Sequence, residues 1–111
     1  KAETVRQRLI EETGNPNLEV IAVDLSSMKS VVSFAGQILE RNLPVSLLMN
    51  NAGTMETGFS ITSDGFERTV SVNYVAPYLL TRKLIPAMVR GASTYRKYGF
   101  VHVCNRETRF S

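Results

Sequence analysis

The stretch VSLLMNNAGT, residues 45–54, carries an apolar run directly into two adjacent asparagines. The apolar run has the composition of a buried strand, whereas Asn50 and Asn51 each bring an amide that needs several hydrogen-bond partners. An unpaired amide in a dry site costs about 1–3 kcal/mol. We therefore expect the end of this strand to use both amides, beside a backbone that Ala52 and Gly53 leave open to close approach.

Helical spacing of apolar residues alternates with β-branched runs along the whole chain. The order is helix then strand, three times over. Such alternation predicts an α/β fold with a parallel sheet and right-handed crossovers. The expected helices cover residues 2–13, 27–42 and 64–90, and the expected strands cover residues 18–24, 45–50 and 99–104.

The longest expected helix has clear start and stop signals. Asp64 and Glu67 form a capping-box-like pair at its beginning, and Gly91 is expected to end it. Pro77 and Pro86 interrupt the pattern, so we expect a kink at each. The residues expected to face inward are Phe66, Val70, Tyr74, Leu80, Leu84 and Met88.

The composition is that of one ordinary globular domain, with 111 residues, 43% of them apolar, and a net charge of +3. Lys and Arg are scattered, which argues against a nucleic-acid partner, and no apolar run reaches the roughly 20 residues that span a bilayer. The single cysteine, Cys104, excludes an intrachain disulfide and favours a reducing compartment, in the cytoplasm or associated with an organelle. One histidine and one cysteine make no metal-ligand cluster, so no metal is expected.

Polar residues stand at the ends of all three expected strands: Asp24, the loop 50–53 and the pair 104–105. Ligands of open parallel sheets bind beyond these carboxyl ends, so the convergence indicates a binding site. Taken alone, Asp24 could equally cap a helix or be a solvated carboxylate.

Three stretches together resemble the short-chain dehydrogenase/reductase family, in the branch that contains the retinol dehydrogenases. They are VDLSSMKSVVSFAGQI (23–38), LLMNNAGT (47–54) and FERTVSVNYVAPYLLTRKLIPAM (66–88). The resemblance implies a doubly wound Rossmann fold that binds NAD or NADP. It also implies hydride transfer between the nicotinamide and a small carbonyl or alcohol substrate.

The resemblance assigns cofactor roles residue by residue. Asp24, with Leu25 beside it, matches the carboxylate that holds the adenine amino group. Asn50 and Asn51 match the pair that braces the central strands and lines the ribose, and the Ala-Gly pair after them permits close backbone approach. Asn73 matches the asparagine of the family's Asn-Ser-Tyr-Lys tetrad, whose backbone carbonyl can hold a water in a proton relay.

The chain departs from the family pattern in two places. The family's two serines fall here on Cys104 and Asn105, with Arg106 as the alternative for the second place. An asparagine can donate a hydrogen bond to a substrate oxygen but lacks the geometry of a hydroxyl. The Tyr-x-x-x-Lys pair does not occur, since neither Tyr95 nor Tyr98 is followed four residues later by Lys, and a Gly-rich phosphate loop does not occur either.

We therefore interpret residues 1–111 as the central part of a single NAD(P)-binding Rossmann domain. In the strand order 3-2-1-4-5-6, two strands belong between residues 18–24 and 45–50. Both would precede Lys1, so only residues 45–50 and 99–104 are expected to pair. Family members often dimerise through the helix at 64–90, which makes a homodimer an expected partner.

Two other functions remain open at this point. The first is a catalytically inactive family member that serves as a cofactor-binding or interaction module, which a missing Tyr-x-x-x-Lys would favour. The second is a flavodoxin-type signalling module, which would need an acidic cluster at the strand ends, where only Asp24 is available.

Overall fold

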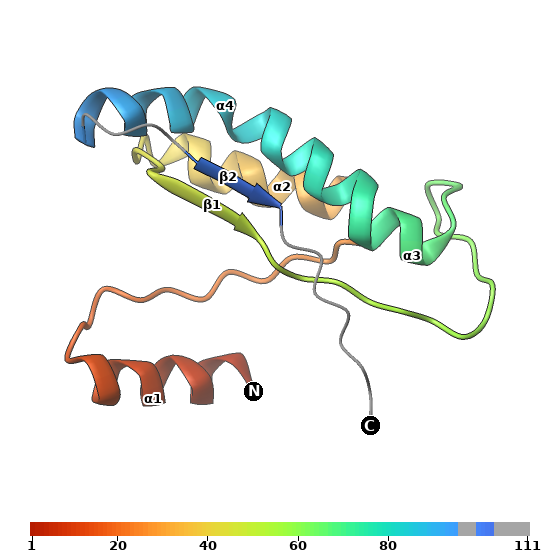
Figure 1. Cartoon of the computed structure of the whole chain (residues 1–111), viewed down its shortest axis with the longest axis horizontal. Helices are drawn as coiled ribbons and strands as arrows, with labels where there is room; N and C mark the ends of the chain where they lie inside the picture. The colour runs from red at the N-terminus through yellow and green to blue at the C-terminus, as the bar shows by residue number, and fades with distance from the viewer. Residues whose placement is uncertain (96–99, 104–111) are drawn as a thin grey trace.

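The computed structural model describes residues 1–95 and 100–103 (Figure 1). Its elements are α1 (Ala2–Thr13), α2 (Met28–Glu40), β1 (Leu47–Asn50), α3 (Arg68–Val70), the π-helical turn η1 (Ser71–Val75), α4 (Ala76–Tyr95) and β2 (Phe100–Val103). The segments α3, η1 and α4 follow one another without a break and form one long helical rod. Figure 1 shows α1 apart from the other elements, joined to α2 by an extended coil.

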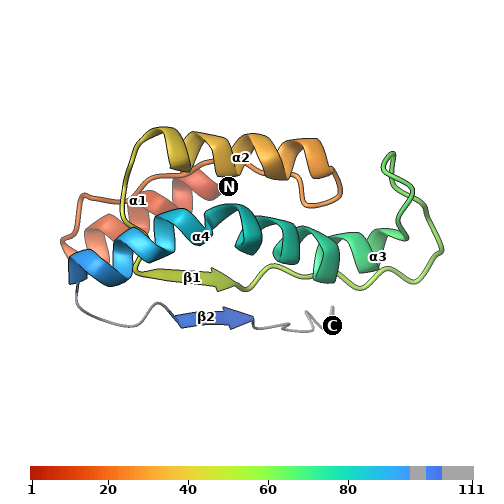
Figure 2. The same ribbon diagram turned by 90° about the horizontal axis from the view of Figure 1, so that it is seen from above.

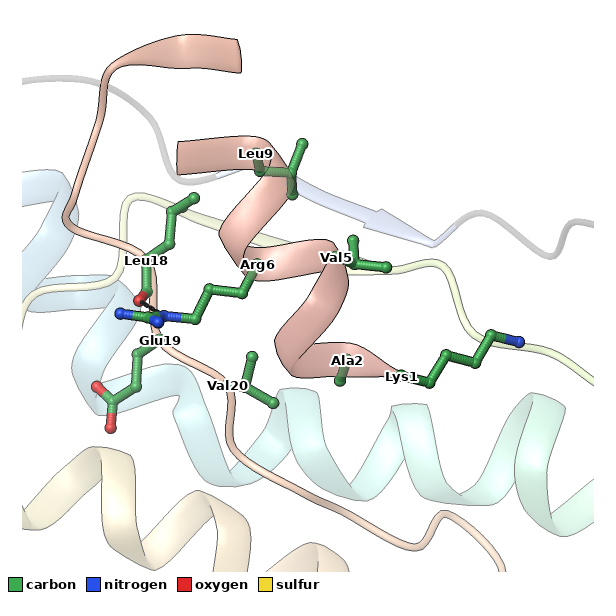
Figure 3. A pocket seen from close by; sticks show the side chains of 8 residues that line it. All are labelled: Lys1, Ala2, Val5, Arg6, Leu9, Leu18, Glu19 and Val20. Atoms are coloured by element: carbon green, nitrogen blue, oxygen red, sulfur yellow. Dashed lines mark hydrogen bonds between the residues drawn. The ribbon is translucent and has the colours of Figure 1, made fainter. Parts of the chain in front are cut away.

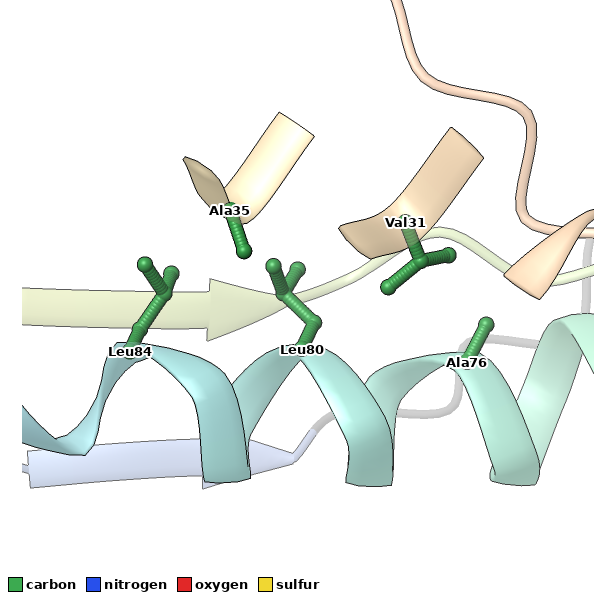
Figure 4. Packing of buried hydrophobic residues seen from close by; sticks show 5 residues of the cluster. All are labelled: Val31, Ala35, Ala76, Leu80 and Leu84. Atoms are coloured by element: carbon green, nitrogen blue, oxygen red, sulfur yellow. The ribbon is translucent and has the colours of Figure 1, made fainter. Parts of the chain in front are cut away.

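The core lies between α2 and α4. Two buried residues of α2, Val31 and Ala35, pack against Ala76, Leu80 and Leu84 of α4 (Figure 4). On its other side α4 contacts β1, so that the helix lies between α2 and the strand pair (Figure 2). This packing fixes the end of β1 against the long helical rod.

The two strands pair in parallel. Leu47 lies opposite Phe100 and Asn50 opposite Val103, so the pairing expected for residues 45–50 and 99–104 is present as a four-residue ladder. The prediction of a strand at residues 18–24 is wrong, because this segment is extended coil. Its β-branched residues have the propensity of a strand but no neighbouring strand among the described residues, and a strand needs a ladder partner to exist.

The long helix begins later than expected, and its caps are different. Glu67 is the N-cap, with its carboxylate accepting from the N–H groups of Thr69 at 3.0 Å and Val70 at 2.9 Å. Asp64 instead contacts the first turn of α2, because its Oδ2 accepts from the N–H of Met28 at 2.9 Å. The loop before the rod is thereby tied to the beginning of α2.

The π turn explains why two of the residues expected to face inward, Val70 and Tyr74, do not. The π turn η1 holds one extra residue. The buried residues are therefore five positions apart from Ser71 to Ala76, and four positions apart after Ala76. Val70 and Tyr74 fall outside this row and are 48% and 70% exposed. Phe66 lies in the loop before the rod and is also exposed. Leu80, Leu84 and Met88 are buried as expected.

Gly91 does not end the long helix, which continues through Pro86 to Tyr95. A Cβ at Gly91 would lie 2.0 Å from the carbonyl oxygen of Val45. The N–H of Val45 also donates to the carbonyl of Ala87 at 3.0 Å. Glycine at position 91 therefore lets the chain entering β1 lie directly against α4.

Candidate functional site

The π turn connects two of the segments that the sequence assigned to a binding site. The hydroxyl of Ser71, a fully buried residue, donates to the carbonyl of Leu25 at 3.3 Å. Two residues further, the Oδ1 of Asn73 accepts from the N–H of Thr54 at 2.8 Å, and its Nδ2 donates to the carbonyl of Thr54 at 2.7 Å. The segment around Leu25 and the loop after β1 are thus both held by η1, and π turns occur frequently at functional sites.

The two adjacent asparagines face different environments. Asn50 is buried, and its Nδ2 donates to the hydroxyl of Thr81 on α4 at 3.0 Å. Asn51 is exposed, and its N–H donates to the carbonyl of Met49 at 3.1 Å. The buried amide therefore secures the end of β1 to the helix, while the exposed amide faces solvent, where a ligand can reach it.

Asp24 is an exposed carboxylate in a tight turn before α2. Its Oδ1 accepts from the N–H of Ser26 at 2.9 Å and from the Ser26 hydroxyl at 2.6 Å. These two bonds, together with the positive charge of Arg68, lower the pKa of Asp24, so the side chain is ionised at neutral pH. The N-cap of α2 is Ser27, whose Oγ accepts from the N–H of Ser30 at 3.3 Å. Asp24 therefore stabilises the turn but does not cap the helix.

The described part of the site offers hydrogen-bonding groups and accessible backbone to a polar ligand. The ionised carboxylate of Asp24 is an acceptor for an amino group, and the exposed amide of Asn51 can both donate and accept. Ala52 is exposed and Gly53 half-buried, so the backbone beside them carries little side-chain bulk. These groups can bind the amino and hydroxyl groups of a polar ligand.

The remaining expected site residues lie outside the described residues. Cys104, Asn105 and the alternative Arg106 all belong to this group. The sequence reasoning in turn missed Ser71 and Thr81, which hold the site together from the long helical rod. For Ser71, the available signal in the sequence was a small hydroxyl residue two positions before Asn73. Periodicity alone did not distinguish such a buried serine from a solvated one.

An apolar groove of about 570 Å³ lies elsewhere, between α1 and the coil that follows it (Figure 3). Its apolar lining comes from Ala2, Val5, Leu9, Leu18 and Val20. The guanidinium Nε of Arg6 bridges its two sides by donating to the carbonyl of Leu18 at 2.6 Å. None of the expected site residues lines this groove. Within the part of the chain that the structure describes, no helix has the length and apolar character to cross a membrane.

A family model described as short chain dehydrogenase matches residues 1–95. The chain is 36% identical over 87 residues to short-chain dehydrogenase TIC 32 A, chloroplastic, of Brassica napus, covering 78% of this chain and 27% of that protein. It is 37% identical over 92 residues to retinol dehydrogenase 11 of Homo sapiens, covering 83% of this chain and 29% of that protein.

One similar solved structure is that of a metagenomic short-chain oxidoreductase in complex with NADP. The TM-score is 0.66 at 28% sequence identity, over 90% of this chain and 43% of that chain. The chain spans little more than a quarter of the length of the two curated relatives.

Proposed function

Because this chain belongs to the short-chain dehydrogenase family, we propose that residues 1–111 are the central part of a single NAD(P)-binding Rossmann domain with a doubly wound parallel sheet. The proposed activity is hydride transfer between NAD or NADP and a small carbonyl or alcohol substrate. The family match over residues 1–95 supports it. The observation that carries it is the π turn, which brings two candidate cofactor segments to one place through Ser71 and Asn73.

The environment of each side chain supports its proposed cofactor-binding role. Asp24, ionised and exposed, accepts a hydrogen bond from the adenine amino group, and Leu25 lies beside it. Asn51 reaches the ribose with its exposed amide, while Asn50 braces the strand end through Thr81. The small residues that follow leave room for the backbone to approach the cofactor.

Asn73 acts through its backbone carbonyl. Its side chain is engaged by Thr54, and Pro77 has no N–H to donate to that carbonyl as the fourth residue along an α-helix would. In this proposal the carbonyl holds a water that passes a proton to or from solvent. A nicotinamide cofactor, when bound at these residues, would supply or accept the hydride. Asn105, at the place of the family's serine, donates a hydrogen bond to the substrate oxygen.

The proposed partner, besides the substrate, is a second copy of the protein. Apolar and aromatic side chains remain exposed on the helical rod at residues 64–90: Tyr74, Tyr78, Ile85 and Val89 are 70%, 59%, 42% and 60% exposed. A row of this kind suits a helix-to-helix contact across a two-fold axis. Sedimentation of the full-length gene product tests it, because Tyr78→Arg should shift a dimer toward monomer.

A reducing compartment, in the cytoplasm or associated with an organelle, is proposed as the location of the protein.

Calorimetric titration of NAD and NADP onto the full-length gene product tests the cofactor site. We expect Asp24→Ala to weaken the affinity for the preferred cofactor about tenfold, because a charged hydrogen bond is lost. Glu40→Ala is the matched control, since it removes an exposed carboxylate at the other end of α2. Unchanged affinity in Asp24→Ala would limit that residue to the turn before α2, and absence of binding in the unaltered protein would contradict the proposed function.

A further inference from the structure

Ser71 is a polar residue in an otherwise apolar row. It is fully buried, and it stands directly before Ala76, Leu80 and Leu84 in the row that faces the core. Burying a hydroxyl is favourable only where it has a hydrogen-bond partner. That partner is the carbonyl of Leu25, which lies 46 residues earlier in the chain at 3.3 Å.

Apart from the bond to Ser71, the hydrogen bonds of the turn that contains Leu25 connect it, among the described residues, only to the beginning of α2. The N–H of Asp24 donates to the hydroxyl of Ser30 at 2.9 Å, and the N–H of Ser27 donates to the carbonyl of Asp24 at 3.1 Å. These bonds shape the turn but do not relate it to the loop after β1. The bond from Ser71 ties the turn directly to the π turn.

The same π turn holds the second segment. Asn73 grips the backbone of Thr54 through two hydrogen bonds, two residues after Ser71. The peptide units from Ser71 to Asn73 are a short, hydrogen-bonded piece of helix, so they set the separation between the two segments. One segment presents Asp24, and the other presents Asn51 and Gly53.

We infer that Ser71 is a positioning residue, which holds the Asp24–Leu25 turn at the distance from the Asn51–Thr54 loop that the adenosine part of a dinucleotide can bridge. The inference rests on the proposed NAD(P) site, and it adds a residue that touches neither the cofactor nor the substrate. Adenine and its ribose are joined in one nucleoside, so both contacts form together only when the two segments lie at the right separation. The nicotinamide half is indifferent to that separation.

Ser71→Ala in the full-length gene product tests this, with binding followed by calorimetry or by fluorescence of the reduced cofactor. We expect about fivefold weaker binding of NADPH or NADH, the loss that one hydrogen bond represents. The affinity for AMP should fall by a similar factor, because AMP carries both contacted groups, whereas the affinity for nicotinamide mononucleotide should stay unchanged. Ser93→Ala is the matched control, because it removes a serine hydroxyl bonded to the carbonyl of Val89 at 3.2 Å on the same helix, and it should change none of them.

A double-mutant cycle separates positioning from general destabilisation. In an Asp24→Ala background the adenine contact is already lost, so Ser71→Ala should weaken dinucleotide binding by less than twofold further. If Ser71→Ala does not fold, Ser71→Cys keeps nearly the same volume with a weaker donor and should show the same pattern.

Three outcomes would overturn the inference. They are unchanged dinucleotide affinity, an equal loss for the dinucleotide and for both halves, and full additivity with Asp24→Ala. Absence of dinucleotide binding by the unaltered protein would overturn the proposed function as well, which distinguishes the two failures.

Discussion

The side-chain amide of Asn73 and the backbone of Thr54 hold each other through two hydrogen bonds, of 2.8 and 2.7 Å. The amide oxygen accepts from the N–H of Thr54, and the amide nitrogen donates to the carbonyl of Thr54. Both polar ends of the side chain are therefore hydrogen-bonded. This contact connects the helical rod to the loop that follows β1. The catalytic role proposed for Asn73 is therefore assigned to its own backbone carbonyl, since the side chain is already engaged.

Asn73→Ala should destabilise the full-length gene product, measured without cofactor, by about 2 kcal/mol. The reason is that both polar groups of Thr54 lose their partner in a half-buried place. Asn51→Ala is the control, because that side chain is exposed, and its effect should stay within about 0.5 kcal/mol. Urea denaturation measures both, and equal effects would contradict a structural role for the amide.

Gly91→Ala should destabilise the protein by about 2 kcal/mol or more, because the new Cβ would lie 2.0 Å from the backbone oxygen of Val45. Gly36→Ala is a sensitive control, since a Cβ there meets nothing within 4 Å inside α2. That substitution should stabilise the protein by roughly 0.5–1 kcal/mol through helix propensity. Melting temperatures that move in the same direction for both would contradict the close approach of α4 and Val45.

Glu67→Ala should lower the melting temperature at neutral pH and have little effect in acid. Hydrogen bonds from the N–H groups of Thr69 and Val70 lower the pKa of Glu67 in the folded protein. A depressed pKa contributes stability above the unfolded value, and this contribution is lost as the pH falls through the folded one. The two proteins should therefore converge below the ordinary glutamate pKa of about 4.3. Glu40→Ala, an exposed control on α2, should show a smaller difference from the unaltered protein at pH 7.

The 111-residue chain, expressed alone, should oxidise neither NADH nor NADPH with a panel of carbonyl compounds. Its sequence holds no Tyr-x-x-x-Lys pair, and general acid–base groups contribute about 10²–10⁴ in rate. We also expect it to be molten or aggregated, because Val20 in the extended coil is 44% exposed and Leu47 and Met49 in β1 are 53% and 59% exposed, and the two strands have no further neighbour among the described residues. Turnover, or a cooperative thermal transition with dispersed amide signals from a soluble monomer, would contradict this.

Local patterns in the sequence predicted much of the fold. The helices at residues 2–13 and 28–40, the long rod and the strand ending in Asn50 are present, and the family resemblance is confirmed. These features follow from apolar spacing and from motifs such as LLMNNAGT, which a short window contains whole. Roles in cofactor binding and catalysis for Asp24, Asn51 and Asn73 stay predictions.

Other features depended on residues far apart in the chain. The strand expected at residues 18–24 did not form, because strand propensity needs a neighbouring strand before it produces a ladder. The prediction of which residues face inward was wrong for the part of the rod before Ala76. The extra residue of the π turn changes which side chains face the core, and a constant helical repeat of about 3.6 residues does not predict such a change.

By itself, the sequence determined which segments are helical, which strand carries the asparagines, and the family to which they belong. Only the tertiary structure decided what the polar residues hold: Asn73 reaches Thr54 across 19 residues, and Ser71 reaches Leu25 across 46. The physical reason is that a hydrogen bond depends on where two groups lie in space. That relation is set when α2, α4 and the strands pack together, and no local pattern of side chains contains it.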